Sequence, residues 1–323
     1  MKHVAIIMGG YSSEYKISLV SGNMVFNHLK KEKYIGYRIH IFKENWYYMD
    51  DNEMQHKVDK NDFSVLKDGK KIQFDVVFNA IHGTPGEDGL MQAYFELLNM
   101  PQTSCNYYQA ALTFNKRDLL SVLKPYGIKS AESYYLNLGD EINLNEIIEK
   151  VKLPCFVKPN KSGSSFGISK VMEKSGMLEA IEIAYQEDDE IIIESFLDGT
   201  EVSVGVINYR GEITVLPITE IVSENDFFDY EAKYMGKSQE ITPARISDEI
   251  ANKVRLAAKK AYTILKMTGF SRSEFIIVDD EPFMLEMNTI PGLTSESLIP
   301  QQAKEAGISL EDLFDNAIEL AVI

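Results

Sequence analysis

The sequence lacks the features that mark secreted and membrane proteins. Its 323 residues include only two cysteines, Cys105 and Cys155, whose wide separation fits neither a disulfide framework nor a metal site, so we expect buried, inert thiols. No apolar run approaches the length that spans a bilayer, and the apolar run 4–8 is too short for a signal peptide. We therefore expect a cytoplasmic protein with no membrane partner.

Positive charge is also scarce. Lys and Arg number 33 against 49 Asp and Glu, which gives a formal net charge of −16. A field of this sign repels polyanions, so no nucleic-acid partner is expected. Any anionic substrate must instead meet a local group of Lys, Arg and backbone N–H donors. The length and the 45% hydrophobic content allow two or three packed units with a sizeable core.

The N-terminal part alternates strand and helix patterns. The apolar run 4–8 ends at two glycines before a helical pattern at 18–29, and the run 74–78 ends in a glycine-bearing loop before a helical pattern at 90–98. This order predicts a parallel α/β unit, in which ligands bind at the carboxyl ends of the strands. The polar span 47–69 predicts surface loop and short elements.

From about residue 116 the pattern becomes α+β. Two apolar segments, 155–158 and 190–194, predict strands beside a glycine- and serine-rich loop. A long helix is predicted from Asp248 to Met267, with Ser247 as its N-cap and Gly269 as its stop. Apolar or β-branched runs predict a sheet packed on helices, and they lie at 201–207, 213–218, 274–278 and 282–287.

The loop KPNKSGSSFG, residues 158–167, has the composition of a phosphate-binding segment. Glycine and serine allow a tight backbone with N–H and hydroxyl donors, and Lys158 adds a positive charge. It is not a Walker A sequence, because no Gly-Lys-Ser/Thr follows at the required spacing. An ordinary hairpin turn with a solvent-exposed lysine is the alternative.

Oxygen-bearing side chains gather near the C-terminal end. Glu274, Glu286 and Asn288 are ligands of the type that holds Mg²⁺ against phosphates, and the last two point to one face of a strand. Arg272, with the N–H of Gly292, could stabilise a tetrahedral centre and a transferred phosphoryl group. Acidic strand ends and a surface arginine are the alternatives.

Two N-terminal loops, GGYSSE (9–14) and HGTPGEDG (82–89), contain polar side chains beside glycines. The first lacks the GxGxxG fingerprint, which argues against a dinucleotide-dependent oxidoreductase. Glu14 and His82 could instead bind the ammonium and carboxylate groups of a small zwitterion.

Five segments in this order closely resemble the D-alanine–D-alanine ligases of the ATP-grasp superfamily. They are GGYSSEYKIS, AIHGTPGEDG, KPNKSGSSFG, FFDYEAKY and LEMNTIPGLTSESL, and the resemblance runs from Val4 to about Leu320. It implies an α/β and α+β three-domain ATP-grasp fold with a Rossmann-like parallel-sheet domain at the N-terminus. The implied domains are an N-terminal substrate-binding domain (1–115), a central ATP-grasp domain (116–200) and a C-terminal ATP-grasp catalytic domain (201–323).

The resemblance also implies the reaction. Two D-alanines would be joined to D-alanyl-D-alanine through a D-alanyl phosphate, with release of ADP and phosphate, for peptidoglycan precursor synthesis. Two Mg²⁺ ions, or Mn²⁺ in their place, would act with ATP, and the enzyme would be a homodimer. The resemblance implies that the loop carrying FFDYEAKY closes over the site. Its sequence EAKY resembles the dipeptide-forming members, which favours D-alanine over a hydroxy acid as acceptor.

Individual site residues follow from the matching motif positions. Glu14, Ser164, Arg272, Gly292 and Tyr234 match catalytic positions, and Glu14, His82, Ser297 and Leu298 match positions that hold the two D-alanines. ATP-binding positions are matched by Lys116, Lys158, Ser165, Glu194, Leu197, Glu201 and Lys233, and metal-binding positions by Glu274, Glu286 and Asn288. Glu274 departs from the family, which commonly has Asp there, and Lys16 replaces an acid often found near Glu14.

Three other functions remain open at this point. An ATP-grasp carboxylase or another carboxylate–amine ligase would share the nucleotide-binding half but would not need the loops with Glu14 and His82. A nucleotide sensor without catalysis is expected to lose Arg272 or Glu286, and both are present. A NAD oxidoreductase is disfavoured by the absent glycine fingerprint.

Overall fold

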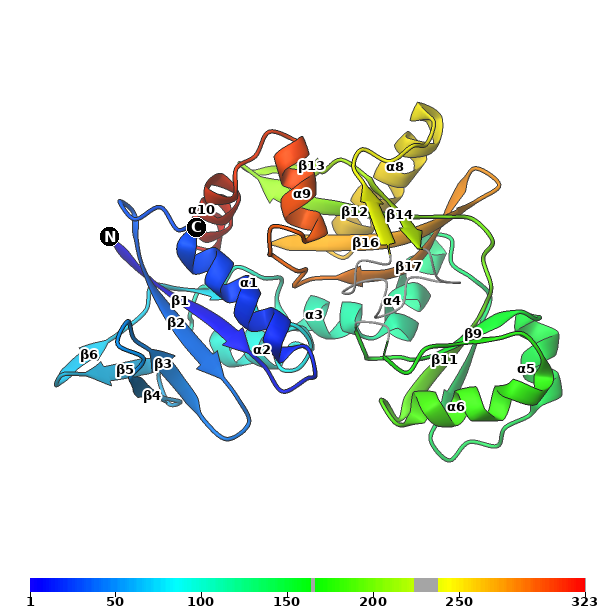
Figure 1. The fold of residues 1–323 in the computed structure, drawn as a ribbon, viewed down its shortest axis with the longest axis horizontal. Helices are drawn as coiled ribbons and strands as arrows, with labels where there is room; N and C mark the ends of the chain where they lie inside the picture. Colours follow the sequence, from blue (N-terminus) through cyan, green and yellow to red (C-terminus); the bar gives the residue numbers. More distant parts are fainter. Residues whose placement is uncertain (164–165, 224–237, 323) are drawn as a thin grey trace.

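The structure, a computed structural model, describes residues 1–163, 166–223 and 238–322. These residues form three sheets that follow one another along the chain (Figure 1). The first sheet lies at the left of the view and the second at the right, with the third between them. None of the described helices is long and apolar enough to cross a membrane.

The first sheet has a parallel centre. Strands β1 (Lys2–Gly9), β2 (Tyr34–Ile41) and β7 (Val76–Asn79) are parallel, and α1 (Tyr15–Asn27) and α2 (Leu90–Leu97) follow β1 and β7 as predicted. The β1 side chains from residue 4 to residue 8 are fully buried, as expected for a strand covered on both faces.

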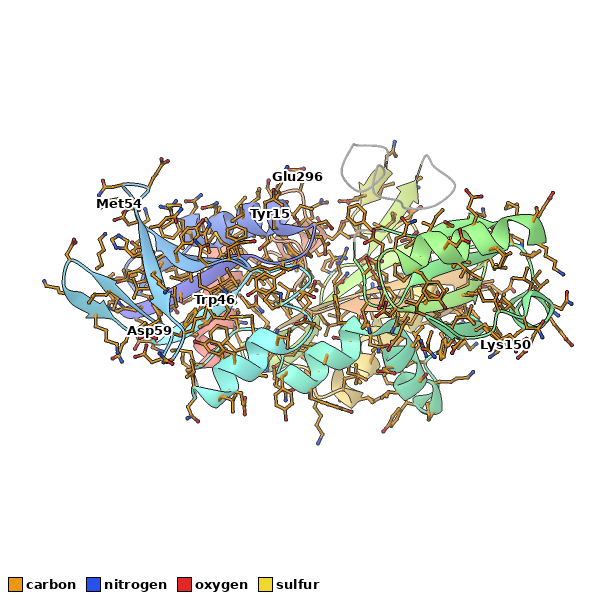
Figure 2. All side chains as sticks on the ribbon, turned by 90° about the horizontal axis from the view of Figure 1, so that it is seen from below. Tyr15, Trp46, Met54, Asp59, Lys150 and Glu296 are labelled. Carbon is orange, nitrogen blue, oxygen red and sulfur yellow. The ribbon has the colours of Figure 1, made fainter. Side chains whose placement is uncertain are left out.

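The polar span 47–69 forms more regular structure than predicted. Its short strands continue the sheet beside β2 as an antiparallel meander, namely β3 (Trp46–Met49), β4 (Gln55–Asp59), β5 (Ser64–Lys67) and β6 (Lys70–Ile72). Tyr48, Val58 and Phe63 are buried there although polar residues surround them, because only one face of the meander joins the core. Figure 2 places the labelled Met54 and Asp59 at the opposite end of the molecule from Lys150.

The second sheet has four strands in the order β10-β9-β11-β8. They are β8 (Ser133–Asn137), β9 (Cys155–Pro159), β10 (Ser169–Val171) and β11 (Glu190–Ser195), and the predicted strands at 155–158 and 190–194 are present. One face packs on α5 (Leu144–Val151) and α6 (Met177–Tyr185) through Cys155, Val157, Ile191 and Ile193. Because side chains alternate along a strand, Phe156, Lys158 and Glu194 point to the other face.

The third sheet is antiparallel and packs on helices, as predicted. Its strands are β12 (Thr200–Tyr209), β13 (Glu212–Val215), β14 (Thr219–Ser223), β15 (Ser238–Ile241), β16 (Phe270–Val278) and β17 (Glu281–Asn288). One face packs on α3 (Tyr107–Phe114), α4 (Lys116–Leu123) and α8 (Asp248–Ile264). On the other face, α9 (Leu298–Glu305) and α10 (Leu310–Ala321) lie between this sheet and the first one.

Helix α8 begins where predicted and ends earlier. The Ser247 side chain accepts a hydrogen bond from the Ile250 N–H at 3.3 Å, which confirms the N-cap. The helix was predicted to reach Met267, but it ends at Ile264, because Lys266 adopts a left-handed φ of 51° and the Met267 N–H bonds to the Tyr262 oxygen. Gly269, the predicted stop, has a φ of 69° one turn later and packs against the main chain at Thr103.

Strand β17 carries a β-bulge beside the site. Glu286 lies opposite Glu274 and Met284 lies opposite Phe275, so Leu285 has no residue opposite it. Met284 and Met287 remain in the core under α8, whereas Leu285 and Glu286 both face away from it. The bulge therefore places an apolar and an acidic side chain together on one face.

Both cysteines are buried and free. Burial raises the pKa of the Cys105 thiol to about 12 and that of Cys155 to about 11. Both thiols are therefore protonated at neutral pH, as expected for inert core residues.

Candidate active site

Two cavities of about 310 and 300 Å³ adjoin between the three sheets. Four residues line both of them, namely Lys116, Ser162, Gly163 and Glu286. The first cavity contains the residues predicted to bind the amino acids and is called the small-substrate cavity after that prediction. It lies against α1, the 82–89 loop and residues 288–298. The second is lined by several of the predicted ATP-binding residues and is called the nucleotide cavity after that prediction. It lies between β9, β11 and the β16–β17 pair.

Two buried lysines line the nucleotide cavity, and one of them, Lys116, also lines the small-substrate cavity. Lys116, the first residue of α4, lies 2.8 Å from the Ser162 oxygen and 3.1 Å from Glu286 Oε2 through its Nζ atom. Lys158 on β9 forms an ion pair with Glu194 on the neighbouring β11. Burial alone lowers the pKa of Lys158, but the carboxylates of Glu194, Glu286 and Glu274 outweigh burial and raise it. Lys158 therefore keeps its positive charge although it is buried.

The nucleotide cavity has an apolar wall that sequence reasoning largely missed. Only Leu197 was predicted there, yet Phe156, Phe196, Ile276 and Leu285 line the same cavity. The missing signal was the period of two, because Phe156 shares a strand face with Lys158 and Phe196 follows Glu194 at the same interval. Glu201, a predicted nucleotide contact, also lines this cavity.

A polar patch lies on β16 and β17 where the cavities meet. Arg272 is directly opposite Asn288, and Glu274 is directly opposite Glu286, so the four side chains share one face of the sheet. Arg272 Nη2 lies 3.0 Å from Glu274 Oε1. This arrangement brings together the three predicted metal ligands and the predicted catalytic arginine.

His82 is engaged by the protein at both ring nitrogens. Nδ1 lies 2.8 Å from the Ile290 main-chain oxygen, and Nε2 lies 3.0 Å from Ser21 Oγ. A carbonyl only accepts, so Nδ1 carries the hydrogen and Nε2 accepts from Ser21. Burial lowers the pKa of His82, which keeps the imidazole neutral. His82 lines the small-substrate cavity as predicted, but its nitrogens bind the neighbouring loops.

Glu87 is a buried carboxyl that sequence reasoning did not select. Its Oε2 accepts the Gly83 N–H at 2.7 Å and its Oε1 accepts the Ile290 N–H at 3.2 Å. Burial, together with the negative charge of Glu14, raises the pKa of Glu87 to about 7. An acid within the glycine-bearing segment HGTPGEDG was the available signal, because a carboxyl there can bind loop N–H groups.

Glu14 and Ser297 lie in tight corners of the small-substrate cavity. A methyl group at Gly163 would come within 2.9 Å of Glu14 Oε2, and one at Gly292 within 2.7 Å of Ser297 Oγ. A side chain at either position would therefore have to displace the Glu14 carboxylate or the Ser297 hydroxyl. Leu298 lines the same cavity at the start of α9. Ser164, Ser165, Lys233 and Tyr234, four further predicted site residues, lie outside the described residues.

Comparisons with known proteins give a consistent result. Family models described as D-ala D-ala ligase N-terminus and C-terminus match residues 3–105 and 122–319. A D-alanine–D-alanine ligase of Flavobacterium johnsoniae is 77% identical, with 100% of both chains covered.

Two solved structures are also similar. The VanG D-Ala:D-Ser ligase of Enterococcus faecalis is 32% identical with a TM-score of 0.86, and 99% of each chain is covered. A D-alanine–D-alanine ligase from Bacillus anthracis complexed with ATP is 27% identical with a TM-score of 0.81, covering 100% of this chain and 98% of that one.

Proposed function

This chain belongs to the D-alanine–D-alanine ligase family, and we propose that it joins two D-alanines through a D-alanyl phosphate made at the junction of its two cavities. The family makes D-alanyl-D-alanine for peptidoglycan synthesis with ATP, and the predicted ATP-grasp fold class is confirmed. The domain boundaries at 115/116 and 200/201 stay predictions. The observation that carries the proposal is the shared lining of the two cavities by Lys116 and Glu286.

The junction suits a two-step reaction. In the first step, a carboxylate oxygen of one D-alanine attacks the γ-phosphorus of ATP, so a C–O–P linkage forms and ADP leaves. In the second, the amine of another D-alanine attacks the acyl carbon, phosphate leaves and the amine loses a proton. Water would hydrolyse the acyl phosphate, so a site enclosed by protein favours the second step.

The nucleotide cavity is proposed to hold ATP. The base would lie against the apolar wall beside Leu197, and Lys116 and Lys158 would neutralise the phosphates. Glu194 Oε1 is buried without a hydrogen-bond partner among the described residues, and a nucleotide hydroxyl or amine would satisfy it. Glu201 lines the same wall and is proposed to contact the nucleotide. Ser165 and Lys233 are assigned to ATP only by the family resemblance.

The polar patch fits a hard divalent cation. Glu274, Glu286 and Asn288 offer two carboxylates and an amide oxygen on one sheet face, which are ligands that Mg²⁺ or Mn²⁺ accepts. No cluster of three or more Asp, Glu, His or Cys suited to a metal occurs in the described part of the chain, so phosphate oxygens or water would have to complete the coordination. Two bound Mg²⁺ ions would neutralise negative charge on the phosphates.

The small-substrate cavity is proposed to hold both amino acids. Glu14 would bind the ammonium of the first D-alanine, while Ser297 and the main chain at Leu298 would bind the second. Arg272 and the Gly292 N–H would stabilise charge on the tetrahedral intermediate. His82 would act by holding the loop that carries Gly292. Ser164 and Tyr234 are proposed as partners of Glu14 on the resemblance alone.

The acceptor needs a direct test, because one similar structure is a D-Ala:D-Ser ligase. We propose D-alanine in both positions. Phosphate release would be measured with ATP, Mg²⁺ and D-alanine, and with D-serine, D-lactate or L-alanine added or substituted, with products identified by mass. Phosphate release matched by D-alanyl-D-alanine is expected. A mixed product in excess would reassign the acceptor, and no phosphate release with any substrate would reject the proposed reaction.

Two further proposals rest on the family and on ATP as substrate. We propose a homodimer in the cytoplasm, where ATP is available. If the protein is a homodimer, sedimentation equilibrium would give twice the 36.6 kDa mass of the chain. A monomer at micromolar concentration would contradict it.

A further inference from the structure

Asn160 ends the second sheet and caps a helix that belongs to the third. The residue follows β9 directly and is fully buried. Its Oδ1 accepts the Arg117 N–H at 2.9 Å, and its main-chain oxygen accepts the Lys116 N–H at 3.4 Å. These are N–H groups of the first two residues of α4, which no residue within the helix can bind.

The same side chain also holds two partners through its amide hydrogens. Nδ2 donates to Asn115 Oδ1 at 2.8 Å and to Glu190 Oε2 at 2.7 Å. Asn115 is the N-cap of α4 and accepts the Asp118 N–H at 3.0 Å. Burial alone raises the pKa of Glu190, but the hydrogen bond from Asn160 and the charges of Lys161 and Arg117 lower it. Glu190 is therefore an ionised acceptor.

These contacts join two separately packed units. Leu119, Leu120 and Leu123 of α4 lie in the core beneath the third sheet. In contrast, β9 and β11 pair in the second sheet, whose helix-covered face has its own core. Asn160 is thus a joint between the two sheets that enclose the nucleotide cavity.

Asn160 lies between the chain segments that carry the two lysines of the nucleotide cavity. Lys158 lies two residues before Asn160 on β9, and Lys116 is the first residue of α4, bonded to the Asn160 oxygen. Each lysine belongs to a different unit, so their separation depends on how α4 is seated against the end of β9. Lys116 also bonds to the Ser162 oxygen, two residues beyond Asn160.

We propose that Asn160 is a positioning residue that sets the distance between Lys116 and Lys158 and so tunes nucleotide binding. The inference rests on the proposed function, since it takes both lysines as nucleotide ligands. Asn160 touches no substrate in this assignment, because it lines neither cavity. It acts through the helix cap and through Glu190.

The test compares Asn160→Ala and Asn160→Asp with a matched control, Asn145→Ala. Asn145 is an exposed asparagine of α5 in the second unit, and its side chain bonds only to Lys174 in the described structure. Losing buried hydrogen bonds at the joint is expected to raise the KM for ATP and the Kd for ADP about tenfold or more. The KM for D-alanine should change less than about twofold, as expected when only one site is displaced.

Asn160→Asp keeps the volume and the acceptor for Arg117 but brings a second carboxylate against Glu190. Adding Glu190→Gln supplies an amide donor to that carboxylate, so the double variant should recover part of the ADP affinity. The proposal would be overturned if the Asn160 variants raised the KM values for ATP and D-alanine equally, or if they left the Kd for ADP unchanged. Calorimetric ADP binding needs no turnover, so wild-type protein that binds ADP but makes no dipeptide would refute the proposed function instead.

Discussion

The Nδ1 atom of His82 lies 2.8 Å from the main-chain oxygen of Ile290, a residue 208 positions further along the chain. Glu87 accepts the N–H of the same Ile290 at 3.2 Å, so both backbone polar atoms of this residue are held by the 82–89 loop. Ser21 extends the contact, since its Oγ accepts the Leu293 N–H at 3.2 Å. The turn that carries Gly292 is therefore fixed by side chains of the N-terminal unit.

Substitutions of His82 are expected to distinguish the contributions of its two hydrogen bonds, one to Ile290 and one to Ser21. His82→Ala loses both and should lower kcat/KM for D-alanine about 100-fold, while the KM for ATP changes little, because two buried polar partners are left unsatisfied. His82→Asn can place its amide near the Nδ1 position and should retain part of the activity. Steady-state kinetics with each substrate varied would check this, and an equal rise in both KM values would argue for general disruption.

Glu87→Gln tests the buried carboxyl. The pKa of Glu87 is raised from 4.5 to about 7, so the folded protein binds this proton more tightly than the unfolded chain does. The stabilisation from the proton is fully present below pH 4.5 and is lost as the pH rises through about 7. Relative to Glu87→Gln, the wild type should lose about 3 kcal/mol of unfolding free energy across this range.

The measurement is urea unfolding of both proteins at several pH values, taken as the difference between them. Glu96→Gln on α2 is the control, because Glu96 is an exposed acid on the neighbouring helix. If the difference in unfolding free energy between wild type and Glu87→Gln does not vary with pH, Glu87 ionises in the ordinary carboxyl range.

Much of the placement of the candidate site residues was predictable because they lie in short motifs on strands and loops. Glu286 and Asn288 are two residues apart, and this spacing alone places them on one face of β17. The pairing with Arg272 and Glu274 was not predictable, because it depends on the register of β16 against β17 and on the bulge at Leu285. A bulge changes which residues of two neighbouring strands lie opposite each other, and no strong local sequence pattern marks its position.

Residues that act through distant partners were missed for the same reason. Asn160 looks like an ordinary loop residue in the sequence, and only its glycine-bearing segment distinguished Glu87. Their buried contacts are with the start of α4 and with Ile290 respectively. The meander 46–72 was underestimated because its strands are short and only one face is buried. Local composition does not report such long-range packing.

Arg272→Ala is expected to lower turnover strongly while nucleotide binding is largely retained. The guanidinium lies on the sheet face between Asn288 and Glu274, beside the small-substrate cavity and not in the nucleotide cavity. Removing one donor to a developing oxyanion costs about 100- to 1000-fold in kcat. Turnover and calorimetric ADP binding would be measured on the same preparation. Unchanged turnover would remove Arg272 from the mechanism.

Glu286→Gln is expected to raise the Mg²⁺ concentration needed for half-maximal turnover. The change removes one of the two carboxylates of the polar patch, which should weaken binding of a hard cation about tenfold or more. Glu281→Gln is the matched control on the same strand, since Glu281 pairs with Lys129 and Lys253 away from both cavities. EDTA should stop turnover and Mg²⁺ should restore it. An unchanged Mg²⁺ requirement in Glu286→Gln would exclude Glu286 as a ligand.

Asp315→Ala tests the contact between helix α10 and the segment that joins α1 to β2. Asp315 on α10 binds Lys30, Lys33 and Tyr34 at 2.6 to 3.0 Å, and its side chain is 8% exposed, compared with 45% for the neighbouring Asp312. Removing the buried partner leaves polar groups unsatisfied and should cost about 2–3 kcal/mol of unfolding free energy, whereas Asp312→Ala should cost less than about 1 kcal/mol.

The pH dependence gives a second check on Asp315. Burial alone raises its pKa, but the hydrogen bonds from Lys30, Lys33 and Tyr34 outweigh burial and lower it. A carboxyl with a lowered pKa stabilises the fold above its unfolded pKa, and this stabilisation is lost as the pH falls through the folded value. The difference between wild type and Asp315→Ala in urea unfolding should therefore be largest at neutral pH and shrink in acid. Equal losses for the Asp315 and Asp312 variants would mean that the contact acts only as a surface charge pair.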